Sequence, residues 1–181
     1  VIHSVNQEAA GLPSRNDAKT FFYALIYGAG DGKIGKIINK SAQAGRAVKT
    51  RFLDSMPALK SLIESCHFQV AKKGTITLLD GREVPCRSQH AALNVQLQGD
   101  GAMIMKLGQV LFSEKLNDLY PNRFAFMATV HDEWQLECDP NIAEEVGKLG
   151  VLSIIEAGEK LGCNIPMDGN YQIGKDWSEC H

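Results

Sequence analysis

Residues 124 to 137, Phe-Ala-Phe-Met-Ala-Thr-Val-His-Asp-Glu-Trp-Gln-Leu-Glu, place two adjacent carboxylates inside a run of strand-forming residues. Strand side chains point alternately to opposite faces, so Asp132 and Glu133 cannot both face one ligand on a straight strand. We therefore expect a tight turn here, with a strand on either side. Such a turn would expose Asp132 to bind a hard cation such as magnesium through oxygen. The alternative is a hairpin tip whose charges are only solvated, because acidic turns are common.

The size and composition predict a globular, soluble chain. Its 181 residues can form one domain or two small lobes. With 44% apolar residues, 22% charged residues and no long apolar run, we expect no transmembrane span and no membrane partner. The N-terminal sequence Val-Ile-His-Ser is not a signal peptide. The missing initiator Met could reflect ordinary trimming, but it favours a fragment of a longer protein. We expect a cytoplasmic location, in the host cell if the source is viral.

Cysteine spacing and charge add two constraints. Five cysteines without a C-x-x-C pair argue against a disulfide framework and against a zinc site.

The net charge of −2 gives no global basic field, but the charge is unevenly distributed along the chain. Lys33 to Arg51 holds six basic residues and no acidic one, whereas Asp132 to Glu145 holds six acidic residues and no basic one. A basic lobe with an acidic centre, or two solvated helix faces, would both give this pattern.

Local signals predict a mainly helical chain with two hairpins. Ser14 or Asn16 can cap a helix that ends before Gly28, and further helices are expected near residues 33–39 and 42–70, the second interrupted at Pro57. Asp80-Gly81 predicts a two-residue hairpin turn. The remaining expected elements are a helix from Ser88 to about 119 with a weak point at residues 99–101, a helix near 142–155 and an extended piece near 165–173.

The first predicted helix carries chemistry on one face. Arg15, Lys19, Tyr23 and Tyr27 recur at four-residue spacing, which keeps all four side chains on one side of an α-helix. Two cations near a helix N-terminus are unfavourable unless an anion lies between them. A polyphosphate would fit, with the phenols meeting a sugar and a base. The alternative is a solvated basic edge with two half-buried tyrosines, and His3 is either a third phosphate contact or a plain surface residue.

These motifs resemble those of family A DNA polymerases. Arg15-x-x-x-Lys19-x-x-x-Tyr23-x-x-x-Tyr27-Gly28 is similar to the family's fingers helix, and Val130-His131-Asp132-Glu133 is similar to its palm motif with a metal-binding aspartate. Further similarities are Asp80-Gly81-Arg82, the stretch from His90 to Gly99 and the closing Trp177-Ser-Glu-Cys-His181. Within the family, the sequences of these motifs most resemble those of the replicative polymerases of short-tailed phages.

The resemblance implies a nucleotide site. Arg15, Lys19 and His3 would hold the triphosphate of a dNTP, and Lys19 would also protonate the leaving pyrophosphate. Tyr23 would pack beside the sugar, where its hydroxyl could replace the bond lost when the 3′-hydroxyl is missing. We therefore expect weak discrimination against dideoxynucleotides. Tyr27 would stack at the template base or the nascent pair.

The resemblance also implies contacts with primer-template DNA. Gln98 and His131 would touch the minor groove at the primer end, where every correct pair presents acceptors. Asn94 and His90 would support template or nucleotide contacts, and Arg82 is a further candidate for DNA binding. Asn94 and Gln98 could instead be ordinary amides on a helix surface.

Asp132, with Glu133 beside it, would form part of a two-metal magnesium site that carries out nucleotidyl transfer. The partner aspartate of this family lies upstream of the fingers helix, and the given chain starts after it. Glu8 has no strand-like context and does not replace it. We therefore expect this chain to be inactive alone. Its partners would be the first palm strands, the thumb and, in some relatives, an exonuclease domain.

The resemblance predicts an α+β fold, with a helical fingers lobe at residues 1–75. Residues 76–181 would form the C-terminal part of a palm, with a small antiparallel sheet and long backing helices. The predicted function is template-directed DNA synthesis, and the alternative is a non-catalytic DNA-binding or regulatory fragment. A metal-dependent hydrolase using Asp132, Glu133 and His131 would leave the Arg15 to Tyr27 helix unexplained. An exposed apolar sheet edge is expected where further palm strands would pair.

Overall fold

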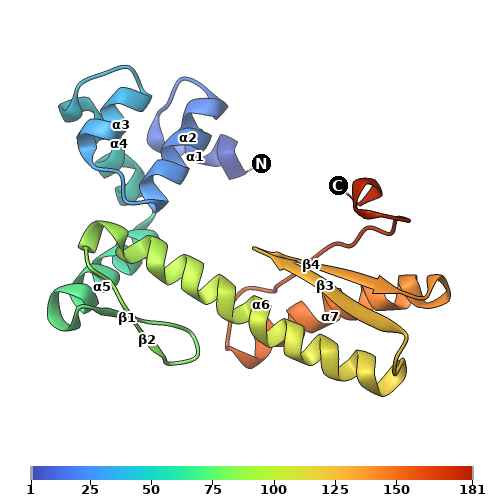
Figure 1. The fold of residues 1–181 in the computed structure, drawn as a ribbon. Helices are drawn as coiled ribbons and strands as arrows, with labels where there is room; N and C mark the ends of the chain where they lie inside the picture. Colours follow the sequence, from blue (N-terminus) through green and yellow to red (C-terminus); the bar gives the residue numbers. More distant parts are fainter. Residues whose placement is uncertain (1, 181) are drawn as a thin grey trace. The chain divides into compact units, whose positions relative to one another are not determined.

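The computed structural model describes residues 2–180 and has the predicted α+β fold, with helices and two antiparallel hairpins (Figure 1). The chain divides into two compact units, the first ending at Gln98 and the second beginning at Gly99. The assignment of residues 1–75 to fingers and 76–181 to palm remains a prediction. Within residues 2–180, no helix is both long and apolar enough to cross a membrane.

Five helices open the first unit. They are α1 (Ile2–Ala10), α2 (Arg15–Ile26), α3 (Asp31–Ile37), α4 (Ala42–Ser55) and α5 (Pro57–Lys73). Ser14 caps α2, because its Oγ accepts a hydrogen bond of 3.1 Å from the Asp17 backbone N–H. Pro57 stands at the first turn of α5 and ends the previous helix, so the predicted long helix is split as expected. Helix α1 was not predicted from the sequence; it buries Asn6 and Ala10 and leaves its larger apolar side chains exposed.

A compact aromatic and aliphatic core holds α1 to α4 together. Phe21 on α2 and Phe52 on α4 are fully buried and meet edge to face, with ring centroids 5.2 Å apart. Ile34 joins the same core from α3. Phe21 lies on the side of α2 that faces this core. The outer side of the helix therefore carries the residues that recur every four positions, namely Arg15, Lys19, Tyr23 and Tyr27.

The first hairpin pairs β1 (Thr75–Thr77) with β2 (Glu83–Pro85). The predicted two-residue turn at Asp80-Gly81 is wrong. Leu78 N–H bonds to Arg82 C=O, and Gly81 N–H bonds to Leu78 C=O, both at 2.9 Å, so the loop has three residues. Gly81 adopts φ +83°, as the left-handed position of such a loop requires.

A long helix follows the hairpin. Ser88 caps the 3-10 turn η1 (Gln89–Ala91), which leads directly into α6 (Ala92–Leu119). The helix runs without interruption through residues 99–101, so the predicted weak point does not break it. Gln96 Nε2 donates to the Thr77 carbonyl at 3.2 Å and so ties the start of α6 to β1.

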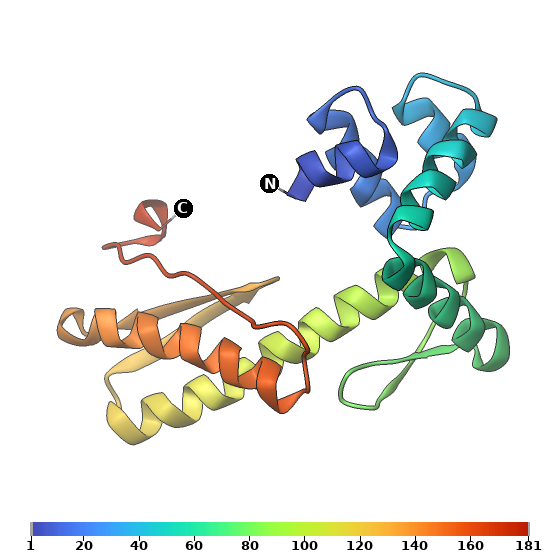
Figure 2. The same ribbon diagram turned by 180° about the vertical axis from the view of Figure 1, so that it is seen from behind.

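The second unit has a hairpin of β3 (Phe124–Val130) and β4 (Glu133–Cys138), then η2 (Pro140–Ile142), α7 (Ala143–Lys160) and η3 (Trp177–Glu179). Both α6 and α7 pack on one face of this hairpin, which Figure 2 shows from behind. Phe112 of α6 is the centre of that contact, with ring centroids 5.7 Å from Phe126 and 5.5 Å from Trp134. The predicted strands, the turn between them and the helix near residues 142–155 are therefore confirmed.

An irregularity in β3 sets which side chains face the helices. The register shifts between Phe126 and Ala128, so Met127 is an extra residue and is 63% exposed. After this extra residue, Thr129 pairs with Trp134 and Val130 pairs with Glu133. Because neighbouring residues of a strand point to opposite faces, Val130 points to the face opposite that of Thr129 and Trp134. Val130 is 41% exposed. The exposed apolar sheet edge expected from the sequence remains a prediction.

Residues 161–180 form no strand, and residues 166–173 of the predicted extended piece lie outside any helix or turn. Two glycines of α7 receive side chains of this segment. An added Cβ at Gly147 would lie 2.3 Å from the Tyr171 ring, and one at Gly158 would lie 2.4 Å from Met167 Cγ. Tyr171 also donates a hydrogen bond of 2.8 Å to Glu144, so the segment is held by side-chain packing rather than by strand pairing.

Candidate functional site

The outer side of α2 presents the four residues expected to bind a nucleotide. Arg15 is the first helical residue, Lys19 and Tyr23 follow at one-turn intervals, and Tyr27 is the C-terminal cap. Both cations are exposed, and neither pairs with a carboxylate within residues 2–180. Tyr23 is 48% exposed and Tyr27 is 61% exposed. The structure therefore brings all four groups to one accessible face.

Helix α1 adds His3 to this face. The rings of His3 and Tyr23 have centroids 6.2 Å apart. Partial burial lowers the pKa of His3 below its usual 6.5, and the positive charges of Arg15 and Lys19 lower it further. Its Nδ1 is buried without a hydrogen-bond partner among the described residues. The charges of Arg15 and Lys19 thus act on His3, and His3 belongs to the same group of side chains as Arg15, Lys19 and Tyr23.

The end of α2 lies against the start of the next candidate segment. Gly28 has φ +74°, and an added Cβ would lie only 1.7 Å from the His90 carbonyl oxygen. Only glycine fits here, because both the backbone conformation and the space exclude a side chain. This contact places His90 beside the residue that follows Tyr27, although the two are far apart in sequence.

The other predicted DNA-binding residues of the first unit differ in their surroundings. Asn94 is half-buried, and its Nδ2 is buried without a hydrogen-bond partner in the described part of the chain. Gln98 is exposed on α6. Arg82 already pairs with Asp80, with 2.6 Å between Nε and Oδ2, so it is not a free cation.

In the second unit, the turn between β3 and β4 consists of His131 and Asp132. His131 has φ +54°, a conformation that histidine adopts more readily than most residues. Both side chains are exposed, and Asp132 forms no ion pair within residues 2–180. Glu133 opens β4 and accepts a hydrogen bond from Gln135. The two neighbouring carboxylates therefore have different environments, and Asp132 is the more available one.

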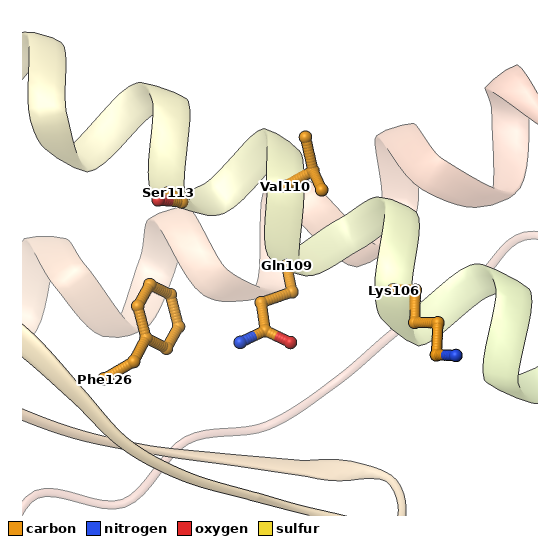
Figure 3. Close-up of a pocket in the computed structure, with 5 residues that line it drawn as sticks. All are labelled: Lys106, Gln109, Val110, Ser113 and Phe126. Atoms are coloured by element: carbon orange, nitrogen blue, oxygen red, sulfur yellow. The ribbon is translucent and has the colours of Figure 1, made fainter.

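The carboxylates of this turn do not by themselves make a complete metal site. Within residues 2–180, no group of three or more His, Cys, Asp or Glu side chains is arranged to hold a metal ion. A shallow groove in the same unit lies elsewhere, between α6 and β3 (Figure 3). Its lining residues are Lys106, Gln109, Val110, Ser113 and Phe126. None of the predicted site residues lines this groove, so it gives no support to the metal site.

The sequence and fold together define a polymerase class. The family profile of DNA polymerase family A matches residues 1–179, and the chain therefore belongs to that family. It is 38% identical over 200 residues to a DNA-directed DNA polymerase of Enterobacteria phage T3, and 37% identical over 203 residues to one of Escherichia phage T7. Each match covers 99% of this chain and 28% of the relative. The resemblance to the phage branch of family A is thus confirmed.

The chain is also similar to a more distant relative and, in fold, to a solved structure. The chain is 27% identical over 188 residues to DNA polymerase I of Aquifex aeolicus, which covers 99% of this chain and 32% of that relative. Its fold is similar to the POL domain of Pol1 from M. smegmatis, solved in complex with DNA primer-template and dNTP. That match has a TM-score of 0.75 and 20% identity, and covers 86% of this chain and 30% of the other. The chain spans less than a third of the length of each of these proteins.

Proposed function

We propose that this chain supplies the nucleotide-binding face and part of the metal site for template-directed DNA synthesis. In that reaction the primer 3′-hydroxyl attacks the α-phosphorus of a dNTP, and pyrophosphate leaves. The observation that carries the proposal is the grouping of His3, Arg15, Lys19 and Tyr23 on one exposed face of α1 and α2. Membership of DNA polymerase family A supports the same reaction.

The cations of α2 would bind the triphosphate. Arg15 can donate two parallel hydrogen bonds to phosphate oxygens, and Lys19 can add a point charge one turn further along. An anion between them would relieve the repulsion that the two side chains and His3 now share. Lys19 would also donate a proton to the pyrophosphate as it leaves, because negative charge develops there during phosphoryl transfer.

The aromatic and amide groups would position the sugar and the DNA. Tyr23 would lie beside the sugar and Tyr27 beside the template base or nascent pair, since both rings are exposed on the same side of α2. Gln98 and His131 would donate to minor-groove acceptors, which are the same in every correct pair. His90 and Asn94 are further contacts of this kind. Arg82 uses Nε for Asp80 and would turn its remaining N–H donors to a DNA phosphate.

Asp132 would bind magnesium, with Glu133 as a weaker neighbour that is already hydrogen-bonded to Gln135. Exposed carboxylate oxygen on a tight turn suits this hard cation. When bound, magnesium would activate the primer hydroxyl and neutralise charge on the phosphates. Because residues 2–180 do not supply a third ligand of these kinds, we propose that a further carboxylate comes from outside this sequence. The chain would then be inactive alone.

Complementation tests this proposal. The chain is mixed with a palm-and-thumb segment of a family A polymerase that carries the first palm aspartate and ends before the fingers helix. Extension of a primer on a template, with magnesium and four dNTPs, is then measured. We expect extension by the mixture and none by either part. Intact DNA binding by the mixture without extension would instead favour the non-catalytic DNA-binding function.

A further inference from the structure

Two buried polar atoms on α1 have no hydrogen-bond partner within residues 2–180. They are Nδ1 of His3 and Nδ2 of Asn6. Asn6 is only 2% exposed, so its amide lies in the protein interior, whereas His3 is half-buried. A buried donor or acceptor that stays unpaired costs free energy, and native proteins rarely contain one without a reason. The phosphate contact proposed for His3 leaves both atoms unexplained.

Helix geometry brings these two side chains to the same face of α1. Asn6 follows His3 by three residues, and side chains at this spacing are neighbours, with Cβ atoms about 5–6 Å apart. Ala10, one further turn along, is buried as well, which identifies this face as the packed one. Because helical side chains lean toward the N-terminus, the Asn6 amide leans over the turn that carries His3.

The two atoms are complementary as hydrogen-bonding groups. The amide Nδ2 of Asn6 can only donate, whereas a neutral imidazole has one nitrogen that donates and one that accepts. His3 stays neutral above pH 6.5, because partial burial and then the charges of Arg15 and Lys19 lower its pKa. A proton on Nδ1 would leave two buried donors side by side without an acceptor. Asn6 therefore favours the tautomer of His3 that carries the proton on Nε2.

We propose that Asn6 is a positioning residue for His3: one water molecule accepts from Asn6 Nδ2, donates to His3 Nδ1 and so fixes the ring with its proton on Nε2. Buried water commonly links polar groups that would otherwise be unpaired. The Nε2–H group then donates to a phosphate oxygen of the nucleotide, and His3 adds a hydrogen bond without a third charge beside Arg15 and Lys19. This last step rests on the proposed function, whereas the link between Asn6 and His3 does not.

The tautomer of His3 tests the link in the full 181-residue chain. NMR shifts of its two ring nitrogens are measured above pH 6.5, after circular dichroism has verified folding. We expect the parent to carry the proton on Nε2, and Asn6→Ser to do the same, because a hydroxyl can still donate. Asn6→Ala should show a mixture of tautomers. Asn6→Asp should move the proton to Nδ1, because an ionised carboxylate only accepts. Ser4→Ala, at an exposed position of α1, is the control and should match the parent.

Binding of dATP without magnesium tests whether Asn6 acts through His3. Asn6→Ala should weaken binding about 2- to 10-fold, as expected for one hydrogen bond. The same substitution should have no further effect in a His3→Ala background, because the group through which Asn6 acts is then missing. A purely structural role for Asn6 would weaken binding by the same factor in both backgrounds.

Unchanged shifts of the His3 ring nitrogens in both Asn6→Ala and Asn6→Asp would overturn the proposal. Equal losses of dATP affinity in the two backgrounds would also overturn it. If the parent bound no dATP while Asn6→Ala changed the tautomer, the proposed nucleotide site would be contradicted, and the positioning of His3 by Asn6 would be supported.

Discussion

The outer face of α2, proposed to bind the nucleotide, and the turn between β3 and β4, proposed to bind magnesium, are built in different ways. On α2, one regular helix presents two cations and two phenols together, and α1 adds a histidine. At the turn, Asp132 is exposed and forms no ion pair within residues 2–180, while Glu133 accepts a hydrogen bond from Gln135. A helix can encode a complete anion-binding set locally. A metal site requires groups from separate segments to converge, and here that convergence is incomplete within residues 2–180.

The largest expected effect is a loss of primer extension when the proposed metal ligand Asp132 is replaced, with dATP binding unchanged. In the complemented polymerase, Asp132→Asn should reduce primer extension by on the order of 10³-fold, because a lost metal ligand removes several kcal/mol of transition-state stabilisation. Binding of dATP without magnesium should stay at the parent level. Single-turnover extension and calorimetry measure the two quantities. Near-normal extension by Asp132→Asn would remove this residue from the metal site.

The α2 face should show the reverse pattern. Arg15→Gln and Lys19→Gln should each weaken dATP binding roughly 10- to 100-fold, since a hydrogen bond between charged groups contributes about 1.5–3 kcal/mol. Titration calorimetry of the 181-residue chain measures this loss. Lys148→Gln is the matched control on α7 and should bind dATP as the parent does. If the control weakens binding equally, the effect is one of net charge rather than of the face.

The contact between α2 and η1 is tested through a glycine pair. Gly28→Ala should destabilise the chain by at least about 1–3 kcal/mol, because the left-handed conformation alone carries that strain. The overlap with the His90 carbonyl adds to it. Gly30→Ala is the control, since Gly30 has φ −71° and an added Cβ meets nothing within 4 Å. Urea unfolding compares the two variants, and equal stabilities would show that the close approach is not needed for folding.

The role of Tyr23 beside the sugar predicts a smaller, selective effect. Tyr23→Phe should increase discrimination against a dideoxynucleotide in the complemented polymerase, because the phenyl ring retains the packing and loses the hydroxyl. The ratio of dTTP to ddTTP incorporation in single-turnover primer extension measures it. Parent and variant with the same ratio would exclude the hydroxyl from sugar recognition.

The smallest expected effect concerns His3. Its pKa is lowered in the folded chain, so the folded state binds fewer protons than the unfolded state between that pKa and about 6.5. The folded state is therefore destabilised as the pH falls through this window, because burial and the charges of Arg15 and Lys19 disfavour the protonated ring, and this penalty is absent above about 6.5. An NMR titration of His3 should give a pKa below 6.5 that rises in Arg15→Gln/Lys19→Gln and on adding dATP. If neither the double substitution nor dATP changed the pKa of His3, His3 would not belong to the nucleotide-binding face.

The sequence predicted the parts of this molecule that depend on local chemistry. Ser14 caps α2 and Pro57 splits the helical stretch, because both act on their own backbone. The turn at Asp132 follows from two charges within strand-forming residues. The four-residue spacing also gave the shared face of α2, since helix geometry alone fixes it.

Features that depend on tertiary contacts were missed. Helix α1 buries Asn6 and exposes Ile2 and Val5, so its sequence lacks an apolar stripe that faces the core. The extra residue at Met127 and the approach of Gly28 to His90 are set by partners distant in sequence. A signal for the second was present, because a glycine directly after a helix often adopts the left-handed conformation. Nothing in the sequence names His90 as the group that lies against it.

Binding of dATP to the 181-residue chain in the absence of magnesium tests the central claim most directly. We expect the parent to bind dATP, Asp132→Asn to bind it equally well, and Arg15→Gln/Lys19→Gln to lose at least about 100-fold in affinity through two charged contacts. Such a result would show that the α2 face is a nucleotide site that does not depend on the metal-binding turn. Unchanged affinity in Arg15→Gln/Lys19→Gln, in a folded protein, would contradict the account.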